Sequence, residues 1–250
     1  MRRAPGEAPF VVPAAARGPM SRVHALRSRL GGRHGYAILL VLVIVSAVYT
    51  VAAPDRPGWH LGVVLIQAAI VATAVLVAHP REAVRVFSTV VVVLALAAAL
   101  VSVLSEGNSK TEFSLLAAVL AALMPLVVWR GLTRTLREEG ASERVIAAAL
   151  SLYLLIGMFC AYVYGAIGEL GAGPLFAGRG DGDVADHVYF SFVTQTTVGY
   201  GDFTPEEPVA RAVAIAQALS GQLYLVTVIS LLVGGYLGRA QARLPREPPS

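Results

Sequence analysis

The chain has 250 residues, of which 56% are hydrophobic and only 14% are charged, and its formal net charge is +4. This balance lies far from that of a soluble globular domain, so it excludes an ordinary soluble fold and indicates a protein with several membrane spans. The one cysteine, Cys160, excludes an intramolecular disulfide and a multi-cysteine metal site, and it is best interpreted as a small core residue.

Residues 1–34 precede the first apolar run and are rich in Arg, Pro, Gly and Ala, with little periodic pattern. This composition predicts a basic cytoplasmic N-terminal arm. Its charge either attracts anionic lipid or only enforces topology, and both interpretations stay open. Cleavage of the first run as a signal peptide is disfavoured, because that run exceeds the usual apolar core of about 7–15 residues.

Six apolar runs are near or above the roughly 18 residues that cross hydrocarbon as a helix. They are residues 36–53, 59–78, 83–104, 113–129, 145–167 and 208–237. We therefore predict an all-α membrane protein with six transmembrane helices per chain. Residues 35–142 form a four-helix transmembrane domain with a linker, residues 143–238 form a second region, and residues 239–250 form a short cytoplasmic tail.

Basic residues gather on one side of these spans. Of the 20 Lys and Arg residues, 16 lie in the arm, in the second-to-third and fourth-to-fifth connections, and in the tail. The other side keeps only Arg56, Lys110, Arg179 and Arg211. The positive-inside rule therefore places both termini in the cytoplasm, and we expect a multi-pass protein of the plasma membrane.

A glycine-rich stretch over residues 168–182 separates the fifth and sixth spans and is followed by a short apolar segment. The glycines predict a flexible extracellular turret. Asp183 or Asp186 is expected to cap a helix over residues 186–195. With about ten residues this helix is too short to span the membrane, and its length suits a re-entrant half-helix.

The half-helix leads into the segment Thr196-Thr197-Val198-Gly199-Tyr200-Gly201-Asp202. This string, the half-helix and the two flanking spans resemble the pore module of the potassium channel family in order and spacing, over about residues 143–238. The resemblance implies a pore helix over 186–195, a filter over 196–202 and an inner helix over 208–237. Because the chain carries one filter and no repeat of it, a homotetramer is implied.

The filter of this family binds potassium through backbone carbonyls that replace the hydration shell of the ion. By resemblance, the ion-binding residues are Thr197, Val198, Gly199, Tyr200 and Gly201, with K+ held at the first four. Glycine suits positions 199 and 201, because carbonyls that all face one way need backbone angles that other L-residues resist. The residues expected to support the filter are Thr196, Asp202, Tyr189 and Phe190. No cofactor is implied beyond the permeant potassium ion.

Two residues before the filter, Val193 and Gln195, depart from the family pattern, so inactivation behaviour stays open. Acids dominate the surroundings of the filter: Glu169, Asp181, Asp183, Asp186, Asp202, Glu206 and Glu207 stand against two arginines. Together they predict a rim that concentrates cations at the entrance. For Asp181, Asp183 and Glu169, a role as solvated loop charges is an equally good interpretation.

Gly221 in the last span lies twenty residues after Gly201, which resembles the spacing of the hinge glycine in related channels. A helix glycine costs about 1 kcal/mol relative to alanine, so it predicts either a hinge or close helix packing. Further along the span, candidates for a hydrophobic gate are Thr227, Val228, Leu231 and Leu232.

A voltage sensor needs arginines that repeat every third position within the membrane. The interiors of the first four spans contain no Lys, Arg, Asp or Glu, and Arg130, Arg134 and Arg137 lie beyond the fourth. Steep voltage gating is therefore not expected. These spans form either a sensor-like fold without charges or an unrelated bundle.

The predicted function is a potassium-selective channel that conducts passively, without enzymatic chemistry and without a nucleic-acid partner. The five histidines lie in the arm, at span ends and at the start of the half-helix, and they indicate neither a nucleophile–base pair nor a metal cluster. The alternatives are a non-conducting or regulatory membrane subunit that retains the pore fold, and a subunit of an active transporter.

Overall fold

The computed structural model describes residues 34–52, 59–78 and 110–242. Its helices are α2 (Gly35–Ala52), α3 (Trp59–Ala78), α5 (Lys110–Glu139), α6 (Glu143–Leu170), α7 (Val184–Gln195), α8 (Pro208–Leu223), the π-helical η1 (Tyr224–Ile229) and α9 (Ser230–Ala242). In these ranges β-structure is limited to isolated bridges at Phe176, so the expected all-α class is found. Nearly all of the arm, the expected span over 83–104 and the end of the tail lie outside the described residues.

Three helices of the described part are long and apolar enough to cross a membrane: Gly35–Ala52, Glu143–Leu170 and the combined helix Pro208–Arg239. They match the expected first, fifth and sixth spans, with ends that differ by a few residues. α3 contains a shorter apolar stretch, Leu65–Val77. The count of six spans stays a prediction.

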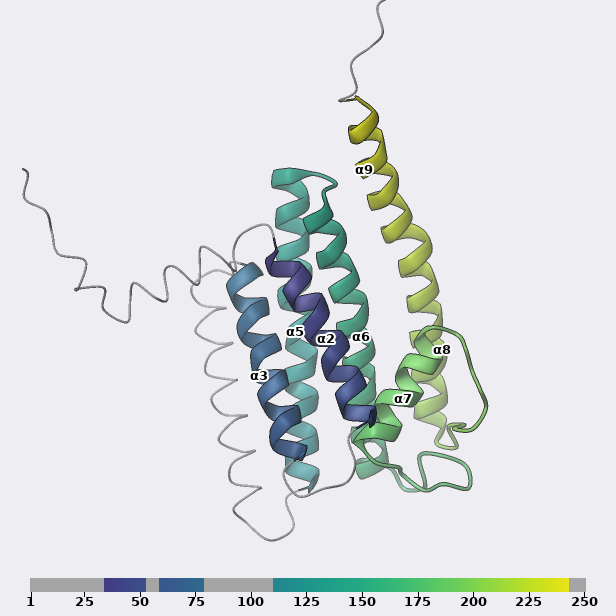
Figure 1. Cartoon of the computed structure of the whole chain (residues 1–250). Coiled ribbons are helices and arrows are strands. Elements are labelled where there is room, and N and C mark those ends of the chain that lie inside the picture. The colour runs from purple at the N-terminus through teal and green to yellow at the C-terminus, as the bar shows by residue number, and fades with distance from the viewer. Residues whose placement is uncertain (1–33, 53–58, 79–109, 243–250) are drawn as a thin grey trace, which may run out of the picture.

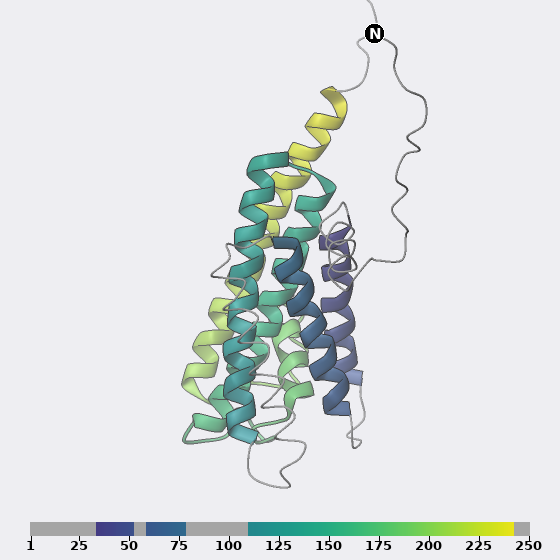
Figure 2. The ribbon, with the colours of Figure 1, turned by 90° about the vertical axis from the view of Figure 1, so that its left-hand side faces the viewer.

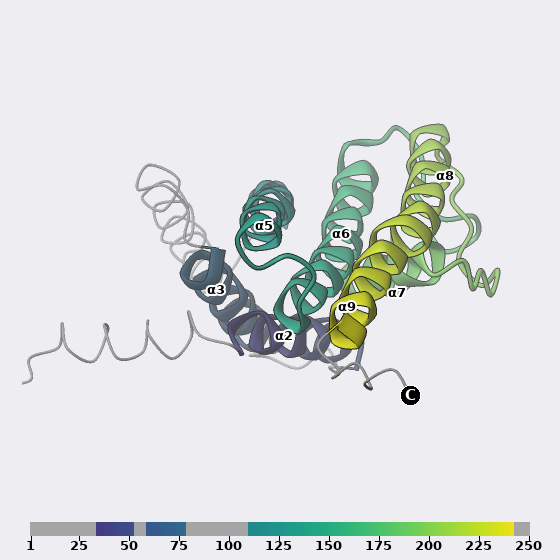
Figure 3. The same cartoon turned by 90° about the horizontal axis from the view of Figure 1, so that it is seen from above.

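α6 lies at the centre of the bundle and contacts α2, α5, α7 and the last helix. Seen from above, α8 and α9 run along the side of α6 that faces away from α3 and α5 (Figure 3). In the most apolar stretch of 18 residues in α6, 61% is buried. In the corresponding stretch of the combined α8–α9 helix, only 11% is buried. The last helix therefore leaves most of its apolar surface uncovered.

The long helices run along one common direction (Figure 2). The start of α2, the α5–α6 corner and the end of α9 lie at one end of the bundle, and the loops around α7 lie at the other end (Figure 1). Small buried residues on α6, Ala148, Ala149 and Ala161, let its neighbours approach closely, as is usual where helices pack by van der Waals contact in lipid.

α5 is one continuous helix, so the expected span over 113–129 and the start of the linker after it lie in the same helix. Pro125 lies inside it. Prolines are tolerated in membrane helices because neighbouring groups satisfy the freed carbonyls. The helix ends at Gly140, whose φ of +64° and whose N–H bond to the Leu136 carbonyl at 2.9 Å form a left-handed cap.

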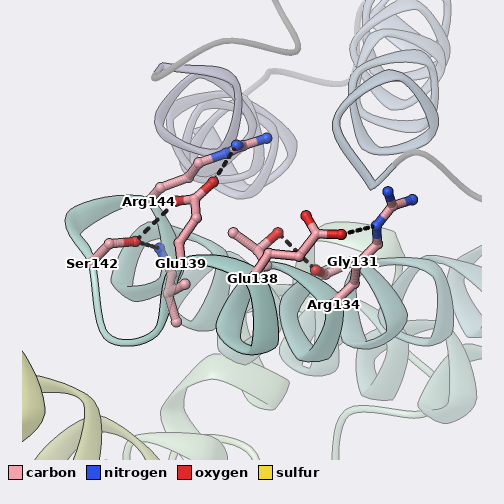
Figure 4. A network of polar contacts seen from close by, with 8 residues as sticks. Gly131, Arg134, Glu138, Glu139, Ser142 and Arg144 are labelled. Carbon is pink, nitrogen blue, oxygen red and sulfur yellow. Dashed lines mark hydrogen bonds and ion pairs between the residues drawn. The ribbon is translucent and has the colours of Figure 1, made fainter.

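Polar contacts hold the corner between α5 and α6 (Figure 4). The Ser142 hydroxyl caps α6 by accepting a hydrogen bond from the Val145 N–H at 3.3 Å. Arg144 pairs with the Glu139 carboxylate at 2.7 Å. Arg239 of α9 donates to the Glu139 carbonyl at 2.6 Å, so the end of the last helix is joined to this corner.

α7 begins at Val184, two residues before the expected start at 186. Of the two cap candidates, Asp183 is the N-cap: its carboxylate accepts from the Asp186 N–H at 2.9 Å. Asp186 completes a capping box by accepting from the Asp183 N–H at 3.1 Å. The capping box explains the earlier start, because it satisfies N–H groups that the first helical turn leaves unbonded.

The glycine-rich loop before α7 is packed, which differs from the flexible turret that we expected. Leu175 and Phe176 are fully buried. The Phe176 ring meets Phe190 and Phe203 edge to face, at centroid distances of 5.1 and 5.0 Å. The Leu175 N–H donates to the Asp181 carboxylate at 3.0 Å. The two buried apolar side chains thus outweigh the glycine content of the loop, and Phe176 anchors it to Phe190 of α7 and to Phe203.

The last span was expected as one helix over 208–237. It extends to Ala242, and its hydrogen bonding changes from α to π over Tyr224–Ile229. Such π segments inside helices are rare and are often found at functional sites.

Candidate functional site

The backbone of the segment Thr196–Asp202 alternates in handedness. Thr197, Gly199 and Gly201 have positive φ values of 58°, 55° and 82°, whereas Val198 and Tyr200 between them do not. An alternation of left- and right-handed residues turns successive carbonyl groups toward one side of the chain. This row of carbonyl oxygens is a suitable set of ligands for a dehydrated cation.

Thr197 is the only residue other than glycine with positive φ in the described part. A β-branched residue in this region is a true outlier, and such strain costs about 1–3 kcal/mol. The surrounding bonds hold it: its N–H donates to the Thr194 carbonyl at 3.0 Å, and the next N–H, of Val198, donates to Val193 at 3.0 Å. From sequence we expected unusual backbone angles at the two glycines, and the structure adds Thr197, to which the period-two alternation extends.

Gln222 of α8 reaches the same residue. Its Nε2 donates a hydrogen bond to the Thr197 hydroxyl at 2.9 Å. We did not expect a role for Gln222 from sequence. The contact joins the last helix directly to the strained end of the segment.

Tyr189 and Asp202, both expected to support the filter, come together behind the segment. The Tyr189 hydroxyl donates to the Asp202 carboxylate, and this hydrogen bond is the main reason why the pKa of Tyr189 is raised. The Tyr189 ring stacks on Tyr200 with a centroid distance of 6.5 Å. Thr196 is held from the helix side, since its hydroxyl donates to the Phe192 carbonyl at 2.6 Å.

Phe190 lies elsewhere. It is buried against Tyr164 and Phe176, at centroid distances of 4.8 and 5.1 Å, and therefore supports the loop and α6 rather than the Tyr200 ring. Val198 and Tyr200 are 51% and 72% exposed in the single chain. These two side chains are thus only partly covered within one copy.

Gly221 lies in a close helix contact. A Cβ atom at this position would be 2.6 Å from the Gln195 carbonyl oxygen, which is closer than real contacts allow. The irregular hydrogen bonding begins three residues later, at Tyr224. Of the two interpretations of Gly221, the structure therefore supports packing, and it puts the departure from α-helical bonding in η1.

The four gate candidates separate into two pairs. Thr227 and Leu231 are exposed, and the Thr227 hydroxyl donates back to the Leu223 carbonyl within its own helix. Leu232 is buried, and Val228 packs partly buried against the bundle core. The expectation that Val228 and Leu232 line a constriction therefore does not fit, because both face the core.

Several of the acids near the segment have structural partners. Asp181 bonds Leu175, Asp183 and Asp186 form the capping box, and Asp202 bonds Tyr189. These contacts favour structural roles for the loop acids over free solvated charges. They do not remove the excess of negative charge at this end of the bundle, which favours cations.

His187 lies buried among these acids, with 8% of its surface exposed. Its Nε2 is 2.8 Å from the Asp181 carbonyl, and because a carbonyl only accepts, this nitrogen carries the proton. Burial lowers the pKa of His187, while the hydrogen bond to Asp181 and the charges of Asp186, Asp183 and Asp181 oppose the shift.

The described part of the chain contains the elements of a pore-loop ion channel module. In chain order they are a long helix, a packed loop, a short capped helix, a carbonyl-lined segment and a second long helix. Residues 148–234 match the family model described as an ion channel. Over this module the chain is similar to the pore-loop potassium channel family.

Three similar relatives are potassium channels by name. "Two-pore potassium channel 1" of Arabidopsis thaliana is 36% identical over 97 residues, which is 39% of this chain and 22% of the relative. "Two pore potassium channel a" of Oryza sativa subsp. japonica is 31% identical over 105 residues, which is 42% of this chain and 28% of the relative. "Voltage-gated potassium channel" of Aeropyrum pernix is 37% identical over 65 residues, which is 26% of this chain and 21% of the relative.

The chain thus spans only about a quarter of the length of these relatives. No solved structure matches it.

Proposed function

We propose that this protein is a potassium-selective channel that conducts passively through the carbonyl row of residues 197–201. The observation that carries the proposal is the alternating backbone at Thr197, Gly199 and Gly201. A potassium ion enters such a row only if the protein oxygens replace its hydration shell at comparable free energy. The carbonyls of Thr197, Val198, Gly199 and Tyr200 supply those oxygens, and the Thr197 hydroxyl adds an inner ring.

The short helix α7 favours the same ion. It ends at Gln195, directly before Thr196, so its C-terminal end adjoins the inner end of the filter. The C-terminus of a helix carries partial negative charge from its unbonded carbonyls, which favours a nearby cation and disfavours anions.

A homotetramer completes the pore in this proposal. One chain supplies one carbonyl row, and a closed pathway of this kind needs four rows around an axis. The uncovered apolar face of α8 and α9 supports assembly. It includes Ile215, Leu219, Leu223, Val226 and Leu231, each at least 60% exposed in the single chain. Such a face is typical of a surface that contacts another copy of the protein or lipid.

We further propose six spans per chain in the plasma membrane, with both termini in the cytoplasm. The end of α5, the α5–α6 corner and the end of α9 lie at the end of the bundle where α2 begins, whereas the loop before α7 lies at the other end (Figure 1). The first three segments carry Arg134, Arg137, Arg144 and Arg239, and the loop carries Arg179. This arrangement supports the positive-inside assignment. The filter then opens outward, and the acidic rim faces the extracellular solution.

Steep voltage gating is not part of the proposal. Within the described spans α2 and α3 there is no charged residue, and moving one charge through 100 mV yields only about 2.3 kcal/mol. Near the end of α5, Arg134 pairs with Glu138 of the same helix at 2.8 Å, on the exposed surface (Figure 4).

Flux from liposomes that contain only the purified protein tests the function. We expect potassium release down its gradient without nucleotide and without another protein. Absence of flux under several pH and lipid conditions would favour a non-conducting or regulatory subunit. Dependence on a nucleotide or on a second ion gradient would favour a transporter subunit.

A further inference from the structure

Gln217 of α8 is buried between α6 and α7, with 3% of its surface exposed. The Tyr164 hydroxyl of α6 donates to its Oε1 at 2.8 Å. Its Nε2 lies 2.7 Å from the Ser191 hydroxyl, 3.1 Å from the Ser191 carbonyl and 3.2 Å from the Gln195 Oε1. One carboxamide therefore connects the three helices of the pore module.

The direction of each hydrogen bond in this network is fixed by its partners. Carbonyl oxygens only accept, so the nitrogen of Gln217 must face the Ser191 carbonyl, and its oxygen must face Tyr164. The Gln195 Nε2 likewise donates to the Tyr153 carbonyl at 2.7 Å, which leaves its Oε1 to accept from Gln217. Ser191 donates its hydroxyl hydrogen to the Gly157 carbonyl at 2.7 Å. Neither amide can flip without losing bonds.

Two glycines bring the helices close enough for this network. Beside Gly157 of α6, a Cβ atom would be 2.8 Å from the Phe192 ring and 3.1 Å from the Gln195 Oε1. Beside Gly221 of α8, it would be 2.6 Å from the Gln195 carbonyl oxygen. The last residue of α7 is therefore enclosed from both sides, with Gln195 only 1% exposed.

We propose that Gln217 is a positioning residue for ion selectivity: through Ser191 and Gln195 it fixes where α7 ends and thus where Thr196 and Thr197 stand. The inference rests on the proposed function. Inside the membrane no water is present to replace a lost partner. Removing the Gln217 amide therefore leaves the Ser191 oxygens and the Gln195 Oε1 without the hydrogen bonds that Gln217 donates. The end of α7 then moves or fluctuates, and the first turn of the filter moves with it.

The test compares Gln217→Met, Gln195→Met and the double variant with wild type, because methionine keeps the length and loses the hydrogen bonds. Gln67→Met is the matched control. Gln67 is a partly buried glutamine on α3 that donates to Tyr162 at 3.2 Å and to Ser46 at 3.3 Å, away from the filter. Gln217→Glu is the conservative rescue, since a buried glutamate stays protonated and keeps one donor and one acceptor.

The first measurement is amide hydrogen exchange of the peptide that contains residues 193–199 in the full-length protein. We expect Gln217→Met to speed this exchange about fivefold, the equivalent of one buried hydrogen bond of about 1 kcal/mol. Gln67→Met should leave it unchanged, and Gln217→Glu should fall between wild type and Gln217→Met. Equal acceleration in the control, or no acceleration in Gln217→Met, would overturn the proposal.

The second measurement is the potassium-to-sodium permeability ratio in bilayers. We expect a decrease of about fivefold in Gln217→Met and no further decrease in the double variant, because both glutamines act along one path. An unchanged ratio in a variant that assembles, or independent effects of the two substitutions, would overturn the proposal. Wild type that conducts without selectivity would instead refute the proposed function, and hydrogen exchange would still decide the role of Gln217.

Discussion

The Gln222 carboxamide donates a hydrogen bond to the Thr197 hydroxyl at 2.9 Å. This bond joins the last helix to the one residue other than glycine in the described part whose φ is positive. A movement of α8 at this level is therefore transmitted directly to the inner end of the proposed filter. The contact makes Gln222 a residue whose effect can be measured separately from that of the glycines.

Replacement of Gln222 by methionine should weaken potassium selectivity. The substitution removes the side-chain bond that holds Thr197 in its strained conformation, at a cost of about 1 kcal/mol or about fivefold in the permeability ratio. Ser220→Ala is the matched control, because the Ser220 hydroxyl bonds only the Ala216 carbonyl within its own helix, at 2.6 Å. Bilayer recordings in mixed potassium and sodium give the ratio. Equal ratios in both variants would contradict the role of Gln222.

Replacement of Gly199 by alanine should abolish potassium flux in a protein that still folds. A Cβ atom added at Gly199 would meet nothing within 4 Å, so the cost comes only from the φ of +55° at this position. An L-residue in left-handed conformation costs about 1–2 kcal/mol, and here that cost would distort the carbonyl row. Gly173→Ala is the control, since it has equally open space and no positive φ. Flux from Gly199→Ala equal to that from Gly173→Ala would speak against the carbonyl row as the conduction path.

Replacement of Asp183 by alanine should lower the free energy of unfolding by about 1 kcal/mol, the usual value of an N-cap. Asp183→Asn should retain most of the stability, because asparagine caps a helix about as well as aspartate. Thermal unfolding in detergent compares the three proteins. If asparagine were as damaging as alanine, the charge of Asp183 rather than its hydrogen bond would be the stabilising factor.

Acidification should destabilise the protein through His187. Because burial lowers its pKa below the ordinary value of 6.5, the unfolded chain takes up this proton first as pH falls. The stability contributed by neutral His187 is thus complete above about pH 6.5 and is lost as pH falls through the pKa of the folded state. His187→Gln removes this titration. Melting temperatures of wild type should therefore fall more steeply between pH 7 and pH 5 than those of the variant, and parallel curves would contradict the assignment.

Much of the module could be predicted from sequence because its signals are local. The capping aspartate precedes an apolar run, and the glycines at 199 and 201 indicate positive φ. The buried polar network could not be predicted in this way. Gln217 and Gln195 are far apart in sequence, and only the close approach of helices at Gly157 and Gly221 brings their amides together. The sequence did contain one indication of this network. Gln217 is a polar residue in an apolar span, and such a residue often marks a contact between helices.

Other differences come from packing that no single segment encodes. The loop before α7 is anchored because the Phe176 ring packs against Phe190 and Phe203, which are distant from it in sequence. The same contacts turn Phe190 away from the filter. The π-helical segment of the last helix carries no glycine or proline that would indicate it.

Potassium selectivity is tested most directly by reversal potentials of the purified protein in a bilayer with potassium on one side and sodium on the other. We predict a reversal potential close to the potassium equilibrium potential, with little dependence of conductance on voltage. A reversal potential near zero under these conditions would contradict the proposed function, because it would mean that residues 197–201 do not discriminate between the two ions.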